Sequence, residues 1–160
     1  AALDLMSTLT DRDDFENAYF HFIEAARVLA APPEEACERL GYFNVAYEAK
    51  LDFENFAELF NLPACTLTIA HKGRVDKIIL ELNKIPDEVI SYTAFKDESL
   101  ERMSHPCWQK LREMAATLVS ELQPFTEVNC WYMEQDRTNW NDTENETMTA
   151  ERKFSFSTTC

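Results

Sequence analysis

The sequence predicts an α+β fold, in which helices pack on one face of a small antiparallel sheet. Two observations predict the helices: apolar residues recur at helical spacing in residues 10–33 and 104–124, and prolines end both stretches. A third observation predicts the sheet, because β-branched and aromatic residues alternate with polar ones in three segments. These segments are residues 65–83, 125–133 and 152–158.

The first helix has a clear apolar stripe. Thr10 and Asp13 resemble a capping box at its start, and Pro32 together with Pro33 ends it. The acidic residues of its first turn suit the positive end of the helix dipole. The residues that repeat at helical spacing are Phe15, Tyr19, Phe22, Ala26 and Leu29.

The next segment is expected to be helical as well. Pro33 is suited to the first position of a second helix, and Gly41 is a point at which this helix could break. Residues 43–51 fit both helical and strand periodicity, and we favour the helix. A further helix follows, with Asp52 as its candidate cap and Pro63 beyond its end.

The predicted sheet begins at Cys65. Residues 65–71 form the first strand, Gly73 marks a turn, and residues 75–83 form either a second strand or a helix. We favour the hairpin. The alternative fold is a mainly α-helical bundle, in which residues 42–60 and 75–92 are all helical.

The last predicted helix spans residues 104–123. Ser104 is its candidate N-cap and Pro124 ends it. No linker or internal repeat interrupts the chain, which we interpret as a single domain over residues 1–160 with a polar segment at 134–152 as the candidate for mobility. The apolar stripe of this helix comprises Trp108, Leu111, Ala115, Leu118 and Leu122.

The net charge of the chain limits the classes of molecule that it is expected to bind. The net charge is −14, from 29 acidic and 15 basic residues, and such a surface repels nucleic acid and anionic membranes. It attracts basic proteins, so a basic protein partner is expected. No window approaches the ~18 apolar residues of a membrane-spanning helix. The five scattered cysteines and the absence of a signal peptide predict a cytoplasmic protein with reduced thiols.

Three groups of residues carry possible chemistry. His21 and Glu24 lie one helical turn apart, but His21 stands between two phenylalanines and is expected to be packed rather than metal-bound. Cys107 follows His105 at a helix N-terminus, where the dipole can lower the pKa of a thiol. The third group is a basic patch, interpreted as a solvated turn, of His71, Lys72, Arg74 and Lys77.

None of these groups forms a known catalytic or metal-binding motif. We therefore identify no catalytic residue, no metal ligand and no cofactor, and we favour a non-enzyme while leaving enzymatic activity open. A small enzyme or ligand-binding domain is the first alternative, with a pocket between helices and sheet. It would use His71, His105 or Cys107.

The C-terminal part of the chain provides the predicted partner-binding residues. Trp131 and Trp140 stand among amides and carboxylates, as do the aromatic anchors of many protein interfaces. The sequence therefore predicts an acidic interaction module, of an inhibitor or immunity type, that masks a basic partner. A structural homodimer is a further alternative. The predicted partner-binding residues are Trp140, Trp131, Glu134, Asp136, Asp142, Glu144 and Glu146.

Overall fold

The computed structural model describes the backbone of residues 2–129 and the side chains of residues 11–129. Helices form all the regular secondary structure of this described part, which contains no strand. The α+β prediction is therefore wrong for residues 2–129, and the alternative, a mainly α-helical bundle, is confirmed. The elements are α1 (Ala2–Ala30), α2 (Pro33–Arg39), α3 (Val45–Phe56), η1 (Ala57–Asn61), α4 (Ile69–Leu82), α5 (Asp87–Ile90), α6 (Lys96–Met103) and α7 (Trp108–Glu121).

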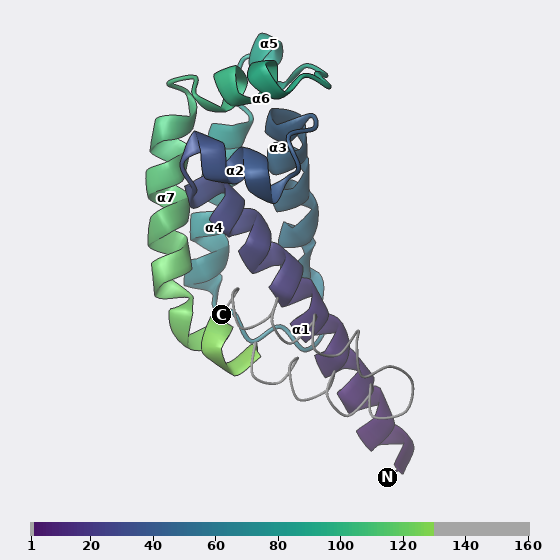
Figure 1. Cartoon of the computed structure of the whole chain (residues 1–160). Helices are drawn as coiled ribbons and strands as arrows, with labels where there is room; N and C mark the ends of the chain where they lie inside the picture. The colour runs from purple at the N-terminus through teal and green to yellow at the C-terminus, as the bar shows by residue number, and fades with distance from the viewer. Residues whose placement is uncertain (1, 130–160) are drawn as a thin grey trace.

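The longest helix, α1, organises the bundle. It packs most extensively against α7 and next against α3, while α4 lies along α7. Figure 1 shows α5 and α6 across one end of the bundle, and the N-terminal part of α1 extending from the other end. After a turn at Leu122, residues 123–129 are helical again and lie at that second end.

The two stripes that the sequence predicts both belong to the core, together with buried residues of α2, α3, η1 and α4. All five stripe residues of α1 and all five stripe residues between Trp108 and Leu122 are buried. Trp108 is fully buried, and its indole Nε1 donates a hydrogen bond to the backbone oxygen of Arg102 at 2.9 Å. This bond satisfies the one polar group of the ring, so the ring can fill the space between α6 and α7.

The predicted hairpin at residues 65–83 is wrong. Residues 65–68 lead without a ladder into α4, and Thr68 opens that helix with a capping box. The Thr68 hydroxyl accepts a hydrogen bond from the His71 backbone N–H at 3.2 Å, and His71 Nδ1 accepts one from the Thr68 N–H at 3.1 Å. Gly73 lies within the helix, where a glycine costs only about 1 kcal/mol relative to alanine. The buried face of α4 consists of Val75, Ile78 and Leu82, which matches the helical alternative for this segment.

Several predicted helix ends also differ from the structure. Thr10 lies inside α1, which begins eight residues earlier than predicted. Asp52 lies inside α3 rather than capping it, and Ser104 ends α6 rather than starting α7. The predicted break at Gly41 is confirmed, because the chain leaves α2 there with a φ of 70°. The prediction that Pro32 ends the first helix is also confirmed, since α1 ends at Ala30.

The predicted strand at residues 125–133 is wrong over its described part, because residues 125–129 are helical. Its remaining residues, 130–133, and the predicted strand at 152–158 lie outside the described part of the chain. Within residues 2–129, no helix has both the length and the apolar character that crossing a bilayer requires.

Candidate functional site

The predicted partner-binding residues cannot be placed, since all of them lie between residues 130 and 160, outside the described part of the chain. They are Trp131, Trp140, Glu134, Asp136, Asp142, Glu144 and Glu146.

The structure uses His21 and Glu24 for packing and ion pairing. His21 is exposed, contrary to prediction, but its ring stacks on Phe56 with centroids 5.2 Å apart. Glu24 forms ion pairs with Arg27 at 2.9 Å and Arg39 at 3.3 Å. Among the described residues, no group of three or more histidine, cysteine or acidic side chains is arranged to hold a metal ion.

Cys107 lacks the features of an activated thiol. Burial raises the pKa of Cys107, the opposite of the lowering that a nucleophilic thiolate needs. His105 Nδ1 accepts a hydrogen bond from the Cys107 backbone N–H at 3.1 Å and so is directed at the backbone of Cys107. Burial also raises the pKa of the fully buried Cys37. Both thiols are therefore expected to be poor nucleophiles near neutral pH.

The predicted basic patch is divided by the helical course of α4. Lys72 pairs with Asp76 at 3.4 Å, and Arg74 pairs with Glu121 of α7 at 2.7 Å. His71 belongs to the capping box of α4. These residues follow a helix rather than converging at a turn, so they offer no preformed anion site.

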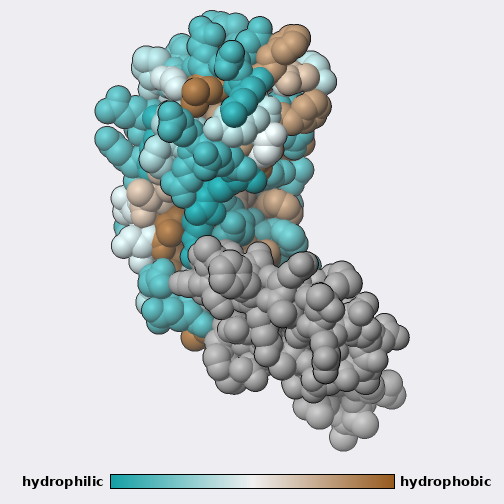
Figure 2. Space-filling model, in the orientation of Figure 1, coloured by the Kyte–Doolittle hydropathy of each residue, from teal (hydrophilic) through white to brown (hydrophobic). Residues whose placement is uncertain are grey.

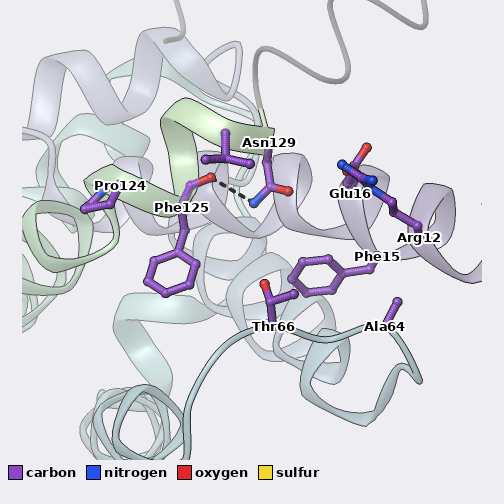
Figure 3. Close-up of a pocket in the computed structure, with 9 residues that line it drawn as sticks. Arg12, Phe15, Glu16, Ala64, Thr66, Pro124, Phe125 and Asn129 are labelled. Carbon is purple, nitrogen blue, oxygen red and sulfur yellow. Dashed lines mark hydrogen bonds and ion pairs between the residues drawn. The ribbon is translucent and has the colours of Figure 1, made fainter.

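Two other features have the geometry of binding sites, and they lie at opposite ends of the bundle. The first is a pocket of about 640 Å³ at the end where the described chain stops. Figure 3 shows the rings of Phe15 and Phe125 beside its open space, with Thr66 and Asn129 at its borders. Three segments that are distant in sequence line it: α1 (Arg12, Phe15, Glu16), the loop after η1 (Ala64, Thr66) and residues 123–129 (Pro124, Phe125, Val128, Asn129).

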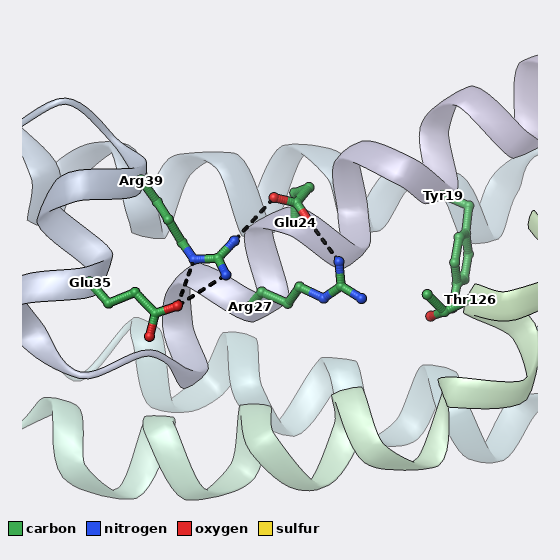
Figure 4. A network of polar contacts seen from close by, with 6 residues as sticks. All are labelled: Tyr19, Glu24, Arg27, Glu35, Arg39 and Thr126. Atoms are coloured by element: carbon green, nitrogen blue, oxygen red, sulfur yellow. Dashed lines mark hydrogen bonds and ion pairs between the residues drawn. The ribbon is translucent and has the colours of Figure 1, made fainter. Parts of the chain in front are cut away.

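A buried hydrogen bond holds the third wall of this pocket in place. The Tyr19 hydroxyl and the Thr126 hydroxyl are 2.8 Å apart, and the Tyr19 hydroxyl also donates to the Leu122 backbone oxygen at 3.3 Å (Figure 4). Burial raises the pKa of Tyr19 to about 12, so the phenol remains protonated and able to donate. These bonds attach residues 122–126 to α1.

The second feature is a group of exposed aromatic side chains at the α5–α6 end, which we call the aromatic crown. It consists of Phe43, Tyr47, Tyr92 and Phe95, which are 50%, 44%, 68% and 69% exposed. The rings of Phe43 and Tyr92 meet edge to face with centroids 5.7 Å apart. Figure 2 shows hydrophobic residues on the surface at this end of the molecule.

The two loops of the crown are joined by hydrogen bonds. The Asn44 backbone N–H donates to the Thr93 oxygen at 2.9 Å, and the Thr93 N–H donates to Asn44 Oδ1 at 3.3 Å. The Thr93 hydroxyl in turn donates to Glu98 at 2.6 Å and accepts from the Phe95 N–H at 3.2 Å. Both Asn44 and Thr93 are buried.

The turn that leads into α3 also has an unusual backbone conformation, with strain at Tyr42. Gly41, Tyr42 and Asn44 all have positive φ, at 70°, 58° and 48°. Residues other than glycine rarely adopt this conformation, and such strain persists only where the surrounding structure enforces it. The sequence signal for this turn is the close spacing of Gly41 and Asn44, although Phe43 lies in the segment for which the sequence favours a helix, and α3 begins only at Val45.

No protein-family model, curated protein or solved structure matches the chain. The two candidate sites therefore rest on the geometry of this molecule.

Proposed function

We propose that the protein is an acidic protein-binding module that masks a basic partner, and that the aromatic crown is the binding surface. The observation that carries this proposal is the group of four exposed aromatic side chains on positions that the fold holds in place. Aromatic residues are enriched at protein interfaces, because they bury a large area at low conformational cost.

Preorganisation supports the crown as a binding surface. The hydrogen bonds between Asn44 and Thr93 fix the two loops before any partner arrives. Lys96 lies over the ring of Tyr42 at 4.5 Å, and Arg102 donates to the backbone oxygen of Ser91. Less loop entropy is then lost on association, which favours affinity.

The charges around the crown support a basic partner. The first turns of α3, α5 and α6, which border the crown, carry five carboxylates at partly or fully exposed positions against one cation, Lys96, which lies over the ring of Tyr42. Together with the net charge of −14, these carboxylates would accelerate encounter with a positively charged protein. The carboxylates are Glu48, Asp87, Glu88, Asp97 and Glu98.

The test is affinity capture from host lysate with the full chain and with a Phe43→Ala/Tyr92→Ala variant, at low and at high salt. The expected result is a stoichiometric basic protein that binds the wild type, binds less at high salt, and is lost from the variant. Purified partner is then titrated against both chains. Removing two interface aromatics should raise the Kd at least about 30-fold.

A control variant and a variant of the competing surface show where the partner binds. Ile69→Ala removes a side chain that is 91% exposed on α4, away from the crown, and should leave the Kd unchanged. Trp140→Ala tests the predicted C-terminal surface in the same titration. If Trp140→Ala abolishes binding and the crown variant does not, the crown is not the binding surface. If no basic partner binds at either salt, the masking function is wrong.

A further inference from the structure

The pocket at the opposite end of the bundle has the size and the walls of a small-molecule site. Its volume of about 640 Å³ lies within the range of ligand sites in proteins. Its walls are mostly apolar, through Phe15, Pro124, Phe125 and Val128. Because α1, the loop after η1 and residues 123–129 each supply a wall, the pocket exists only in the folded chain.

Two phenyl rings are held at fixed positions beside this space. Phe15 is 2% exposed and packs against Tyr19, with ring centroids 6.1 Å apart. Phe125 is held edge-on by the ring of His71, with centroids 5.2 Å apart. Rings in such positions favour a third ring between or beside them, since aromatic pairs gain energy beyond their buried area.

The polar groups of the pocket favour a neutral ligand with a hydrogen-bond donor. Arg12 and Glu16 form an ion pair, with Nε and Oε1 2.9 Å apart, so these two residues together add no net charge to the lining. Asn129 is 6% exposed, and its Nδ2 donates to the Phe125 oxygen at 2.9 Å. That bond fixes the amide and presents its Oδ1 as an acceptor, and the Thr66 hydroxyl is a second acceptor at the border.

We propose that this pocket binds a small neutral aromatic molecule of one or two fused rings that carries a hydrogen-bond donor, of the indole or phenol class. The rings of Phe15 and Phe125 contact the ligand ring, and Asn129 or Thr66 accepts its N–H or O–H hydrogen. This site is separate from the aromatic crown and does not depend on the masking function, because it lies at the other end of the bundle.

The test measures binding of free indole, phenol and indene to the full chain by calorimetry and ligand-observed NMR. Indene has the shape of indole without its N–H. Indole is expected to saturate one site with a Kd on the order of 100 µM, which suits a ligand of this size. Indene should bind about fivefold more weakly, because it cannot donate the hydrogen bond.

A variant that fills the pocket locates the site. Ala64→Trp places an indole in the cavity itself and should weaken indole binding at least tenfold. The matched control, Ala94→Trp, adds the same group at an exposed position beside the crown and should leave binding unchanged. Circular dichroism checks that both variants fold, and Thr66→Phe, at an exposed position of the pocket border, replaces Ala64→Trp if that variant unfolds. Indole binding that survives a folded pocket-filling variant would place the ligand elsewhere and overturn the proposal.

A second pair of titrations tests whether the pocket takes a free ligand or an aromatic side chain of the protein itself. Trp131 and Tyr132 follow Asn129 closely in sequence and carry the same indole and phenol chemistry. A Trp131→Ala/Tyr132→Ala variant is therefore titrated beside the wild type. Equal binding by both chains supports a free ligand. If only the variant binds indole, a tethered ring competes for the pocket and the free-ligand proposal fails; if neither chain binds, it fails as well.

Discussion

The two ends of the bundle present aromatic side chains in opposite ways. At the crown, Tyr92 and Phe95 are more than two-thirds exposed, and polar bonds between loops hold them in position. At the pocket, Phe15 is almost fully buried in the face of α1 and only borders a cavity. The first arrangement suits a large surface that covers the rings, and the second suits a small ligand that enters between them.

The support beneath the two ends also differs. Trp108 anchors α6 to α7 near the crown by filling core space, and Tyr19 anchors residues 122–126 near the pocket through hydroxyl hydrogen bonds. A packing anchor and a hydrogen-bond anchor are expected to respond differently to substitution. The predictions below test this difference.

Replacing Trp108 with alanine should have the largest effect. The ring is fully buried, so its loss leaves a large cavity and removes one of the hydrogen bonds to the Arg102 oxygen, which still accepts from the His105 N–H at 3.2 Å. We expect a decrease of about 3–5 kcal/mol in the free energy of unfolding, measured by urea titration. A loss below about 1 kcal/mol would show that α6 and α7 do not depend on this ring.

The substitution Tyr19→Phe should have an intermediate effect at the pocket end. It retains the ring but removes the hydroxyl that bonds to Thr126 and Leu122, leaving the buried Thr126 hydroxyl without this partner. We expect a loss of about 2 kcal/mol and faster hydrogen exchange in residues 122–129. Unchanged exchange in this segment would mean that other contacts hold the pocket wall.

The same residue predicts a pH dependence. The pKa of Tyr19 is about 12 in the folded chain against 10.0 for the model phenol, so the folded state binds this proton more tightly. Its contribution to stability is therefore complete below about pH 10 and is lost as the pH rises toward about 12. The stability of the wild type should fall more steeply than that of Tyr19→Phe over this interval, measured by urea titration at each pH. Parallel curves would contradict the prediction.

The substitution Asn44→Ala should have a smaller effect, confined to the crown. It removes the acceptor for the Thr93 N–H and places alanine at a φ of 48°. We expect a loss of about 1.5 kcal/mol and weaker partner binding. Asn44→Gly removes the same acceptor, but glycine adopts a positive φ without steric cost, so this variant should lose less stability. Equal losses in both variants would show that the strain at this residue has no measurable cost.

The substitution Arg39→Ala should have the smallest effect. Arg39 joins α1 to α2 through Glu24 at 3.3 Å and Glu35 at 3.0 Å (Figure 4). These side chains are between 30% and 48% exposed, so solvent screens them, and we expect a loss of about 0.5 kcal/mol that high salt removes. A salt-independent loss above about 1.5 kcal/mol would indicate that the pairs are structurally required.

Helices with a long apolar stripe were predictable from the sequence. The stripes of α1 and α7 each repeat over several turns, and prolines near their ends exclude a continuous helix. The segment at residues 65–83 was misassigned because alternating β-branched residues and Gly73 resemble a hairpin. The face formed by Val75, Ile78 and Leu82 decides the matter, since it is buried only if the segment is helical.

The candidate sites could be predicted only in part. Phe15 belongs to a predicted apolar stripe and Phe43 lies in a segment that was also predicted to be helical, and periodicity alone does not distinguish a wall of a pocket from an exposed crown. That distinction depends on contacts between distant segments, such as the bonds from Tyr19 to Thr126 and from Asn44 to Thr93. The prediction at Trp131 and Trp140 stays a prediction, as these residues lie outside the described part of the chain.

The pairing of α1 with α7 has a consequence for synthesis of the chain. The apolar stripe of α1 leaves the ribosome about 90 residues before the end of α7 does, a delay of about 5 to 20 s at ordinary translation rates. During that interval, α1 lacks the helix against which it packs most extensively in the finished bundle. The nascent chain therefore exposes the apolar stripe of α1 early, and α7 can cover it only after α7 has emerged.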